Sequence, residues 1–213
     1  MGTYFRQEYP KDKIIIHHTA GSADVYAVSA WWDMQNNNVS TSKIIGGIFR
    51  NGDARLDGFV LDFYDPKYWS YHLGVNSNGH QIEKTSIGIE LTNYGGLRKT
   101  PFGEYINYVH GIIPEYQVEK LDKPFRGFSY YQAYTQKQID SLKAELLKLA
   151  AEFNIDLHLG MYALLKKGRN AFEIQTSALN SKPGLWGHVN YRRATEKQDP
   201  YPSEILIEMI LSL

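Results

Sequence analysis

Apolar and polar positions along the chain follow two spacings, one typical of strands and the other of helices. Residues 13–18 contain a continuous β-branched run, which predicts a strand covered on both faces, and residues 86–91 predict another strand. Apolar residues recur with a period of about 3.6 over residues 25–35, 135–153 and 201–213, which predicts amphipathic helices. Strands alternating with helices predict an α/β fold, a single domain with a central mixed β-sheet flanked by helices.

Capping residues and turn signals refine this pattern. Asp24 or Ser22 is placed to cap the first helix, and Thr135 with Gln138 forms the pattern of a capping box at the start of the longest one. The other expected elements are strands at 43–49 and 54–63 joined by a turn at 50–53, a polar loop at 76–85, a short strand at 155–157 and a helix at 161–167.

Residues 94–134 differ from the rest of the chain because they are rich in Gly, Pro and Tyr and show no sustained periodicity. An irregular loop of this length is uncommon in a compact domain unless it has a function. We therefore expect an insertion that shapes a groove, inside one domain that spans residues 1–213. No repeat, low-complexity tract or linker divides the sequence.

The composition narrows the range of functions. Lys plus Arg equals Asp plus Glu at 23 each, so the formal net charge is zero, which argues against a nucleic-acid binder or a polybasic membrane anchor. No apolar run is long enough to cross a bilayer, so we expect no transmembrane helix. Charges and a proline stand near the start of the sequence, where a signal peptide would be apolar, so we expect no signal peptide. Cysteine is absent, so a metal site would have to use His and carboxylate.

Three residues have the types that a catalytic zinc site requires. His17 ends the first apolar strand, His188 follows a Pro-Gly turn, and Asp199 stands in Lys-Gln-Asp-Pro. Two imidazoles and one carboxylate fill three of the four positions of zinc and leave one for water, which is the pattern of catalytic sites. Taken separately, each of these residues is more often structural than a ligand.

Five short segments together carry a family resemblance. They are Ile-Ile-Ile-His-His-Thr-Ala-Gly (14–21), Tyr-His-Leu-Gly-Val (71–75), Ser-Ile-Gly-Ile-Glu-Leu (86–91), Tyr-x-x-Tyr-Thr-x-x-Gln-Ile (131–139) and Gly-His…Lys-Gln-Asp-Pro (187–200). In this order they resemble the zinc-dependent N-acetylmuramoyl-L-alanine amidases of the type 2 amidase family. That family includes phage lysins and is related to the peptidoglycan recognition proteins.

The resemblance implies a role for each matching residue. His17, His188 and Asp199 would be the ligands of one Zn²⁺ per chain. Glu90 matches the catalytic glutamate of the family, and Lys197 matches its catalytic lysine. A proton shuttle and an oxyanion partner beside a zinc ion are the groups that amide hydrolysis needs.

Two features leave the metal site open to revision. His18 is the alternative to His17, although successive side chains of a strand point to opposite faces and the match favours His17. The spacing from His188 to Asp199 is one residue longer than is common in the family.

Four residues are expected to contact substrate. His72 matches a position beside the cleft of the family, and Tyr71 would line the same wall. Thr41 or Lys43 would replace a His or aromatic residue that many members carry near the start of the second strand and that this chain lacks.

The resemblance implies a hydrolase that cuts the amide bond between N-acetylmuramic acid and L-alanine in peptidoglycan. One biological role is a phage or prophage endolysin, made in the bacterial cytoplasm and acting on the cell wall. The alternatives are a cytosolic amidase that recycles anhydromuropeptides and a module that binds peptidoglycan without cutting it. We expect a peptidoglycan or muropeptide substrate and favour a monomer.

Overall fold

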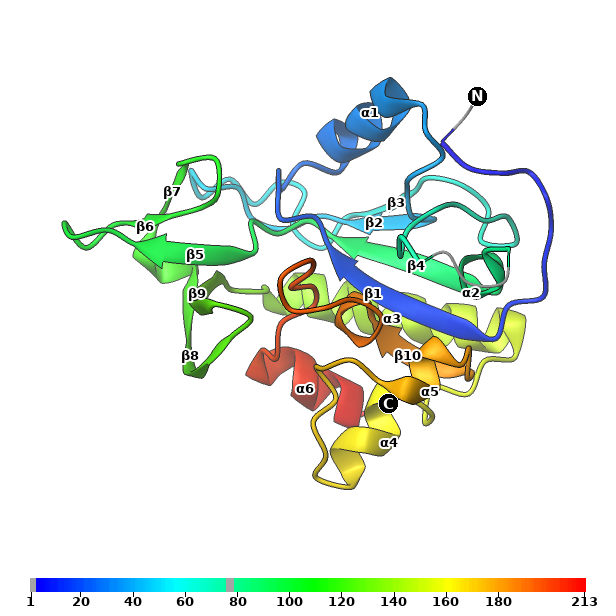
Figure 1. Cartoon of the computed structure of the whole chain (residues 1–213). Coiled ribbons are helices and arrows are strands. Elements are labelled where there is room, and N and C mark those ends of the chain that lie inside the picture. The colour runs from blue at the N-terminus through cyan, green and yellow to red at the C-terminus, as the bar shows by residue number, and fades with distance from the viewer. Residues whose placement is uncertain (1–2, 76–78) are drawn as a thin grey trace.

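A central five-stranded sheet forms the middle of the protein. The computed structural model describes residues 3–75 and 79–213 (Figure 1). The strand order is β10 (Gly184–Gly187), β1 (Lys13–His18), β4 (Ser86–Leu91), β2 (Lys43–Ile45) and β3 (Val60–Asp62). The first four strands are parallel and β3 is antiparallel, so the sheet is mixed, as the sequence predicted. Their carboxyl ends therefore meet at one edge.

Helices cover both faces of this sheet. On one face α1 (Val25–Gln35) packs on Ile44 of β2. On the other face the larger core includes Ile45 together with the apolar stripe of α3 (Gln136–Phe153). Adjacent residues of a strand point to opposite sides, which is why these two neighbours belong to different cores. Both predicted helices are confirmed.

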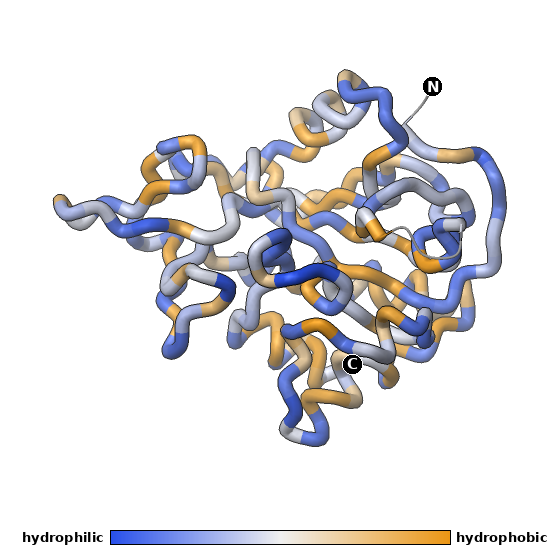
Figure 2. The backbone as a smooth tube through the Cα atoms, viewed as in Figure 1, coloured by the Kyte–Doolittle hydropathy of each residue, from blue (hydrophilic) through white to orange (hydrophobic). Residues whose placement is uncertain are grey.

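Two further helices complete the layer on the α3 side. They are α4 (Met161–Lys166) and α6 (Glu204–Leu211), which contact each other, and α6 also contacts α3. Figure 2 shows orange, hydrophobic stretches gathered where these helices meet the central strands. In the described part of the chain, no helix combines the length and apolarity needed to cross a bilayer.

The caps explain where the two longest helices begin. The Asp24 carboxylate accepts from the backbone N–H groups of Tyr26 and Ala27, so Asp24 is the cap of α1. The Thr135 hydroxyl accepts from the backbone N–H of Gln138, which confirms half of the capping box. The Gln138 amide turns inward instead and donates to backbone carbonyls of the sheet.

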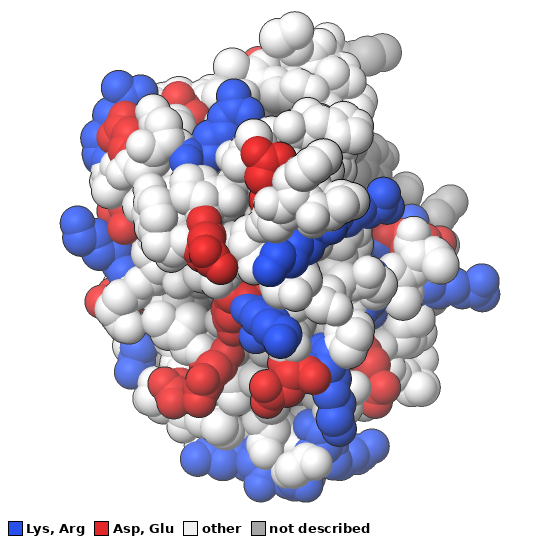
Figure 3. Space-filling view, turned by 90° about the vertical axis from the view of Figure 1, so that its left-hand side faces the viewer, with Lys and Arg blue, Asp and Glu red and all other residues white. Residues whose placement is uncertain are grey.

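A second, antiparallel sheet is formed by residues expected to be irregular. Its order is β7 (Ile112–Ile113), β6 (Tyr105–Ile106), β5 (Gly96–Lys99), β9 (Phe128–Gln132) and β8 (Val118–Phe125). It projects from the central sheet in Figure 1. On the side of the molecule that carries it, basic and acidic side chains are interspersed (Figure 3).

This second sheet corrects the prediction for residues 94–134. It has a small core of its own, formed by Leu97, Tyr105 and Ile113. Three of its strands have only two to four residues, too few to show an alternating pattern in the sequence.

Three smaller predictions need correction. The expected hairpin is present, but its strands are limited to the short antiparallel pair β2–β3. Beyond that pair the Gly46 N–H still donates to the Phe59 carbonyl at 2.8 Å. Residues 155–157 are not a strand; they connect α3 to a turn at 157–158. The expected loop at 76–85 contains α2 (Gln81–Lys84), while 76–78 lie outside the described residues. The remaining elements are α5 (Thr176–Leu179) and the 3₁₀ turns η1 (Glu115–Gln117) and η2 (His188–Asn190).

Candidate metal centre and catalytic pocket

The predicted metal ligands meet at the carboxyl edge of the central sheet. His17 lies near the end of β1, opposite Glu90 in the register of β4. His188 directly follows β10 in η2, and the Val189 N–H donates to the Asp199 carbonyl at 2.8 Å. Crevices at the carboxyl ends of parallel strands are common ligand sites in α/β proteins.

Three ligand atoms converge within this edge. His17 Nδ1 and His188 Nδ1 are 3.0 Å apart, and Asp199 Oδ2 lies 3.0 Å from His188 Nδ1 and 3.5 Å from His17 Nδ1. A tetrahedral zinc ion with bonds of about 2.0–2.1 Å separates its ligands by about 3.3 Å. The three atoms therefore fit one face of a zinc tetrahedron, and the longer spacing to Asp199 is accommodated.

Burial and neighbouring side chains together set the charge of His17 and Asp199. Burial lowers the pKa of His17 to about 4, against the opposing effect of Asp199. Burial alone would raise the pKa of Asp199, but the nearby His188 and His17 outweigh it and hold that pKa well below its ordinary value. Neutral imidazole and ionised carboxylate are the forms that bind zinc.

The second nitrogen of each imidazole has a protein partner. His188 Nε2 donates to the Leu73 carbonyl at 3.1 Å. His17 Nε2 lies 2.9 Å from His72 Nδ1, and His72 Nε2 lies 2.7 Å from Ser86 Oγ. If the Nε2 atoms carry the protons, both Nδ1 lone pairs are free to face a cation.

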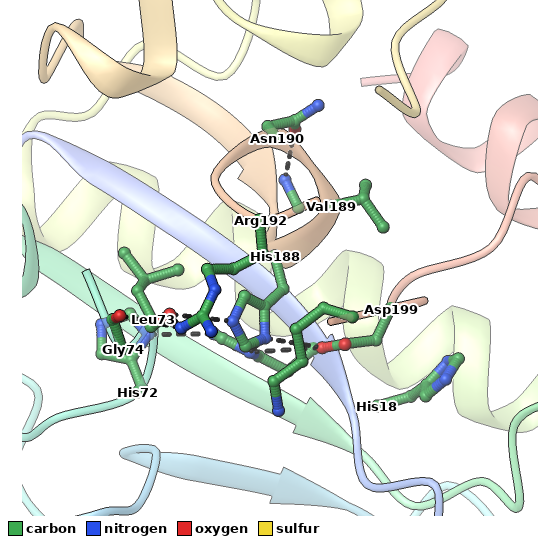
Figure 4. A network of polar contacts seen from close by, with 12 residues as sticks. His18, His72, Leu73, Gly74, His188, Val189, Asn190, Arg192 and Asp199 are labelled. Carbon is green, nitrogen blue, oxygen red and sulfur yellow. Dashed lines mark hydrogen bonds and ion pairs between the residues drawn. The ribbon is translucent and has the colours of Figure 1, made fainter. Parts of the chain in front are cut away.

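His18 lies apart from this group. Its Nδ1 is 2.8 Å from the Tyr134 hydroxyl, and its ring packs against Tyr201. Figure 4 shows His18 separated from His188 and Asp199. The structure thus brings His17, and not His18, into the cluster.

A pocket of about 450 Å³ opens above the three atoms. Its polar lining contains the three candidate ligands with Glu90, Lys197, His72 and Thr41. Its other wall is apolar and is formed mainly by Val28, Trp31, Trp32, Val39 and Tyr108. Trp31 and Tyr108 are 54% and 69% exposed, so a broad aromatic surface is available to a ligand. The sequence predicted that residues 94–134 shape a groove, and Tyr108 of that segment does line the pocket, whereas the contribution of Trp31 and Trp32 from α1 was not predicted.

The two candidate catalytic residues differ in environment. Glu90 is buried, and this burial, reinforced by the charge of Asp199, raises the pKa of its carboxyl well above the ordinary value. Lys197 is exposed at the rim of the pocket. A carboxyl with a raised pKa beside the three candidate metal ligands suits proton transfer near neutral pH.

Two of the expected substrate contacts are not brought to the pocket. The Lys43 ammonium pairs with Asp62 and, at 3.3 Å, with Glu145, beneath the sheet. Tyr71 packs its ring edge-on to Trp69, in an aromatic cluster beside α2. These placements depend on partners distant in sequence, which the local motif does not reveal.

A family model and several solved structures match this chain. The N-acetylmuramoyl-L-alanine amidase family (Amidase_2) matches residues 7–202. The fold is similar to PlyL at 13% identity, with a TM-score of 0.50 over 98% of this chain and 88% of that chain. A mutant of PlyL gives 12% identity and a TM-score of 0.52 over 99% and 91%. The amidase AmiD from E. coli, in complex with anhydro-N-acetylmuramic acid-L-Ala-D-gamma-Glu-L-Lys, gives 16% identity and a TM-score of 0.44 over 82% and 63%.

The sequence matches no curated protein. The family match nevertheless spans most of the chain, from before β1 to beyond Asp199, and so includes every residue of the candidate centre. The chain belongs to the N-acetylmuramoyl-L-alanine amidase family and is an amidase of the type 2 group.

Proposed function

We propose that this amidase holds one Zn²⁺ between His17, His188 and Asp199 and hydrolyses the amide bond between N-acetylmuramic acid and L-alanine in peptidoglycan. The observation that carries the proposal is the triangle of two Nδ1 atoms and one Oδ2 atom, with sides of 3.0, 3.0 and 3.5 Å, at the floor of a pocket. Membership of the family supports the type of bond that is cut.

The residues around the triangle suit each step of this hydrolysis. Zinc bound there would polarise the scissile carbonyl and lower the pKa of a water molecule. Glu90, whose pKa burial raises, would take a proton from the attacking water and pass it to the alanine nitrogen as the C–N bond breaks. The Lys197 ammonium would stabilise the negative charge that forms on the carbonyl oxygen. The products are a lactyl carboxylate and a free amino terminus on the stem peptide.

We further propose that the substrate is a polymer, as for a phage or prophage endolysin. The apolar wall supports this, because Trp31 and Tyr108 extend the pocket well beyond the metal ligands. Aromatic faces are good platforms for sugar rings and peptide side chains. Thr41 remains a candidate contact on the polar side.

We also propose that residues 1–213 form one catalytic domain. Tyr108, in the connection between β6 and β7, lines the same pocket as His17 of the central sheet. A residue of the second sheet region therefore contributes to the proposed site.

The experiment combines metal content with product analysis. Purified protein should contain about one zinc per chain, and mass spectrometry should detect stem peptides released from sacculi, with release abolished by a chelator. Sacculi should be cut faster than soluble anhydromuropeptide. The reverse preference would favour a recycling role, and binding to sacculi with no peptide released would favour a non-catalytic module.

Matched variants separate the roles of the residues. His17→Ala and His188→Ala should lose both zinc and activity, whereas His18→Ala should keep its zinc. Glu90→Ala should keep zinc and lose about 10²–10⁴-fold in turnover, because it removes a proton shuttle and not a ligand. A fully active Glu90→Ala enzyme would refute the mechanism even if zinc were present.

A further inference from the structure

Arg126, in the turn between β8 and β9, reaches across to the segment that carries the candidate metal centre. Its Nη2 donates to the Val189 carbonyl at 2.7 Å. Its Nη1 donates to the carbonyls of Arg192 at 3.0 Å, of Arg193 at 3.1 Å and of Lys197. One guanidinium thus binds four backbone carbonyls between His188 and Asp199.

The segment from 191 to 198 contains no strand or α-helix, and residues 193–197 are exposed. Its other polar contacts are local or lie at its start: Arg192 pairs with Glu196 and donates to the Leu73 and Gly74 carbonyls. Four carbonyl dipoles that point at one place repel one another unless a cation or a donor lies between them. The planar guanidinium supplies both, with its N–H groups arranged in a rigid fork.

The second sheet makes another contact with the same segment. The backbone N–H of Gly96, at the start of β5, donates to Gln198 Oε1 at 3.1 Å. A Cβ at Gly96 would lie 2.5 Å from that oxygen and 2.4 Å from the Phe128 ring, so the approach requires glycine. This contact lies one residue before Asp199.

We propose that the second sheet is a brace for the metal centre, and that Arg126 is the positioning residue through which it holds the 189–198 segment. The metal part of this inference rests on the proposed zinc site. His188 precedes the braced segment, Asp199 follows it, and Lys197 lies within it. Bracing therefore fixes the distance between two candidate ligands and the direction of the lysine.

The test compares Arg126→Ala and Arg126→Lys with Lys123→Ala, an exposed lysine of the same hairpin. Hydrogen exchange and competition with a chromophoric chelator are measured on each full-length protein. Arg126→Ala should speed exchange in 189–198 by at least tenfold, leave β1 and β4 protected, and weaken zinc binding by about 10–100-fold. The exchange rate and zinc affinity of Arg126→Lys should lie between those of Arg126→Ala and the wild type, since an ammonium lacks the fork of N–H groups. Lys123→Ala should match the wild type in both.

The outcomes distinguish the brace from the metal site. If the amide exchange rate in 189–198 and the zinc affinity of Arg126→Ala both lie within twofold of the wild-type values, the brace is refuted. If the wild type binds no zinc, the proposed function fails, while exchange still decides whether Arg126 holds the segment. If Arg126→Ala does not fold, the milder Arg126→Lys and Gln198→Ala decide, and unchanged exchange in both overturns the proposal.

Discussion

At the scale of single residues, the His72 side chain contacts His17 and is placed to orient the ring of that candidate ligand. Its two ring nitrogens lie 2.9 Å from His17 Nε2 and 2.7 Å from Ser86 Oγ, and the Ser86 hydroxyl in turn donates to the Glu83 carbonyl at 3.2 Å. This series of hydrogen bonds would hold His17 in the tautomer whose Nδ1 is free to bind zinc. The ring of His72 is thus fixed by two partners before any substrate arrives.

We therefore predict that His72→Ala weakens zinc binding by about tenfold or more, as is typical when such a partner is lost. His72→Asn, whose amide oxygen can accept from His17, should restore part of the affinity. Competition with a chelator measures both. Wild-type zinc affinity in His72→Ala together with a raised KM would instead assign His72 to substrate contact.

Glu90 gives a prediction that links pH to stability. An unfolded glutamate titrates near ~4.3, and burial raises the pKa in the folded protein. Between these two pKa values the folded state binds more protons, so the stability of the metal-free protein falls as the pH rises through this window.

Glu90→Gln should remove this loss of stability with rising pH, because glutamine does not ionise. At neutral pH the metal-free variant should melt a few degrees higher than the metal-free wild type, given about 2–4 °C per kcal/mol for a chain of this size. Below pH ~4 the two should converge, and the variant should have lost its turnover. Thermal melts over a pH series check this, and parallel curves for both proteins would contradict it.

At the scale of elements, one amide joins the longest helix to the ends of two strands. Gln138 of α3 is buried, and its Nε2 donates to the carbonyls of Thr92 at 2.9 Å and Ile45 at 3.3 Å. Gln138→Leu keeps the size of the side chain but leaves the Thr92 carbonyl without this donor. We expect a loss of about 1–3 kcal/mol, measured by denaturant unfolding. The exposed Gln136→Leu in the same turn should cost much less, and equal costs would show that the bridge is unimportant.

Helices and strands could be predicted from the sequence where they are long enough to show a repeating pattern of apolar residues. The 18-residue helix α3 and the six-residue strands β1 and β4 follow from their own side chains. The second sheet does not, because its strands pair across turns and its shortest members have two residues.

At the scale of the whole molecule, the candidate site was predictable only as far as backbone topology determines it. Motifs at strand ends place His17, Glu90 and His188 at one edge, because parallel strands end on the same side. Side-chain direction is different. Lys43 stands next to the pocket-lining loop but pairs with Glu145 of α3, 102 positions away, and the contacts of Arg126 span 63 to 71 positions.

The same long separations would make a zinc ion bound at the proposed centre a global rather than a local stabiliser. His17 and His188 are 171 positions apart, and their Nδ1 atoms lie 3.0 Å apart only in the folded chain. A ligand that binds the folded state alone stabilises it by about 2.7 kcal/mol at a concentration of 100 Kd. Removing zinc with a chelator should then lower Tm by about 5–11 °C at that concentration.

Two variants test whether this shift arises at the proposed centre. His188→Ala should melt at the same temperature with and without zinc, because it has lost a ligand. Lys197→Ala should keep the full shift although it loses activity, since its side chain lies at the exposed rim and ligates nothing in the proposed scheme. A full zinc-dependent shift in His188→Ala would place the ion elsewhere in the chain, and its loss in Lys197→Ala would show that the rim helps to hold the ion.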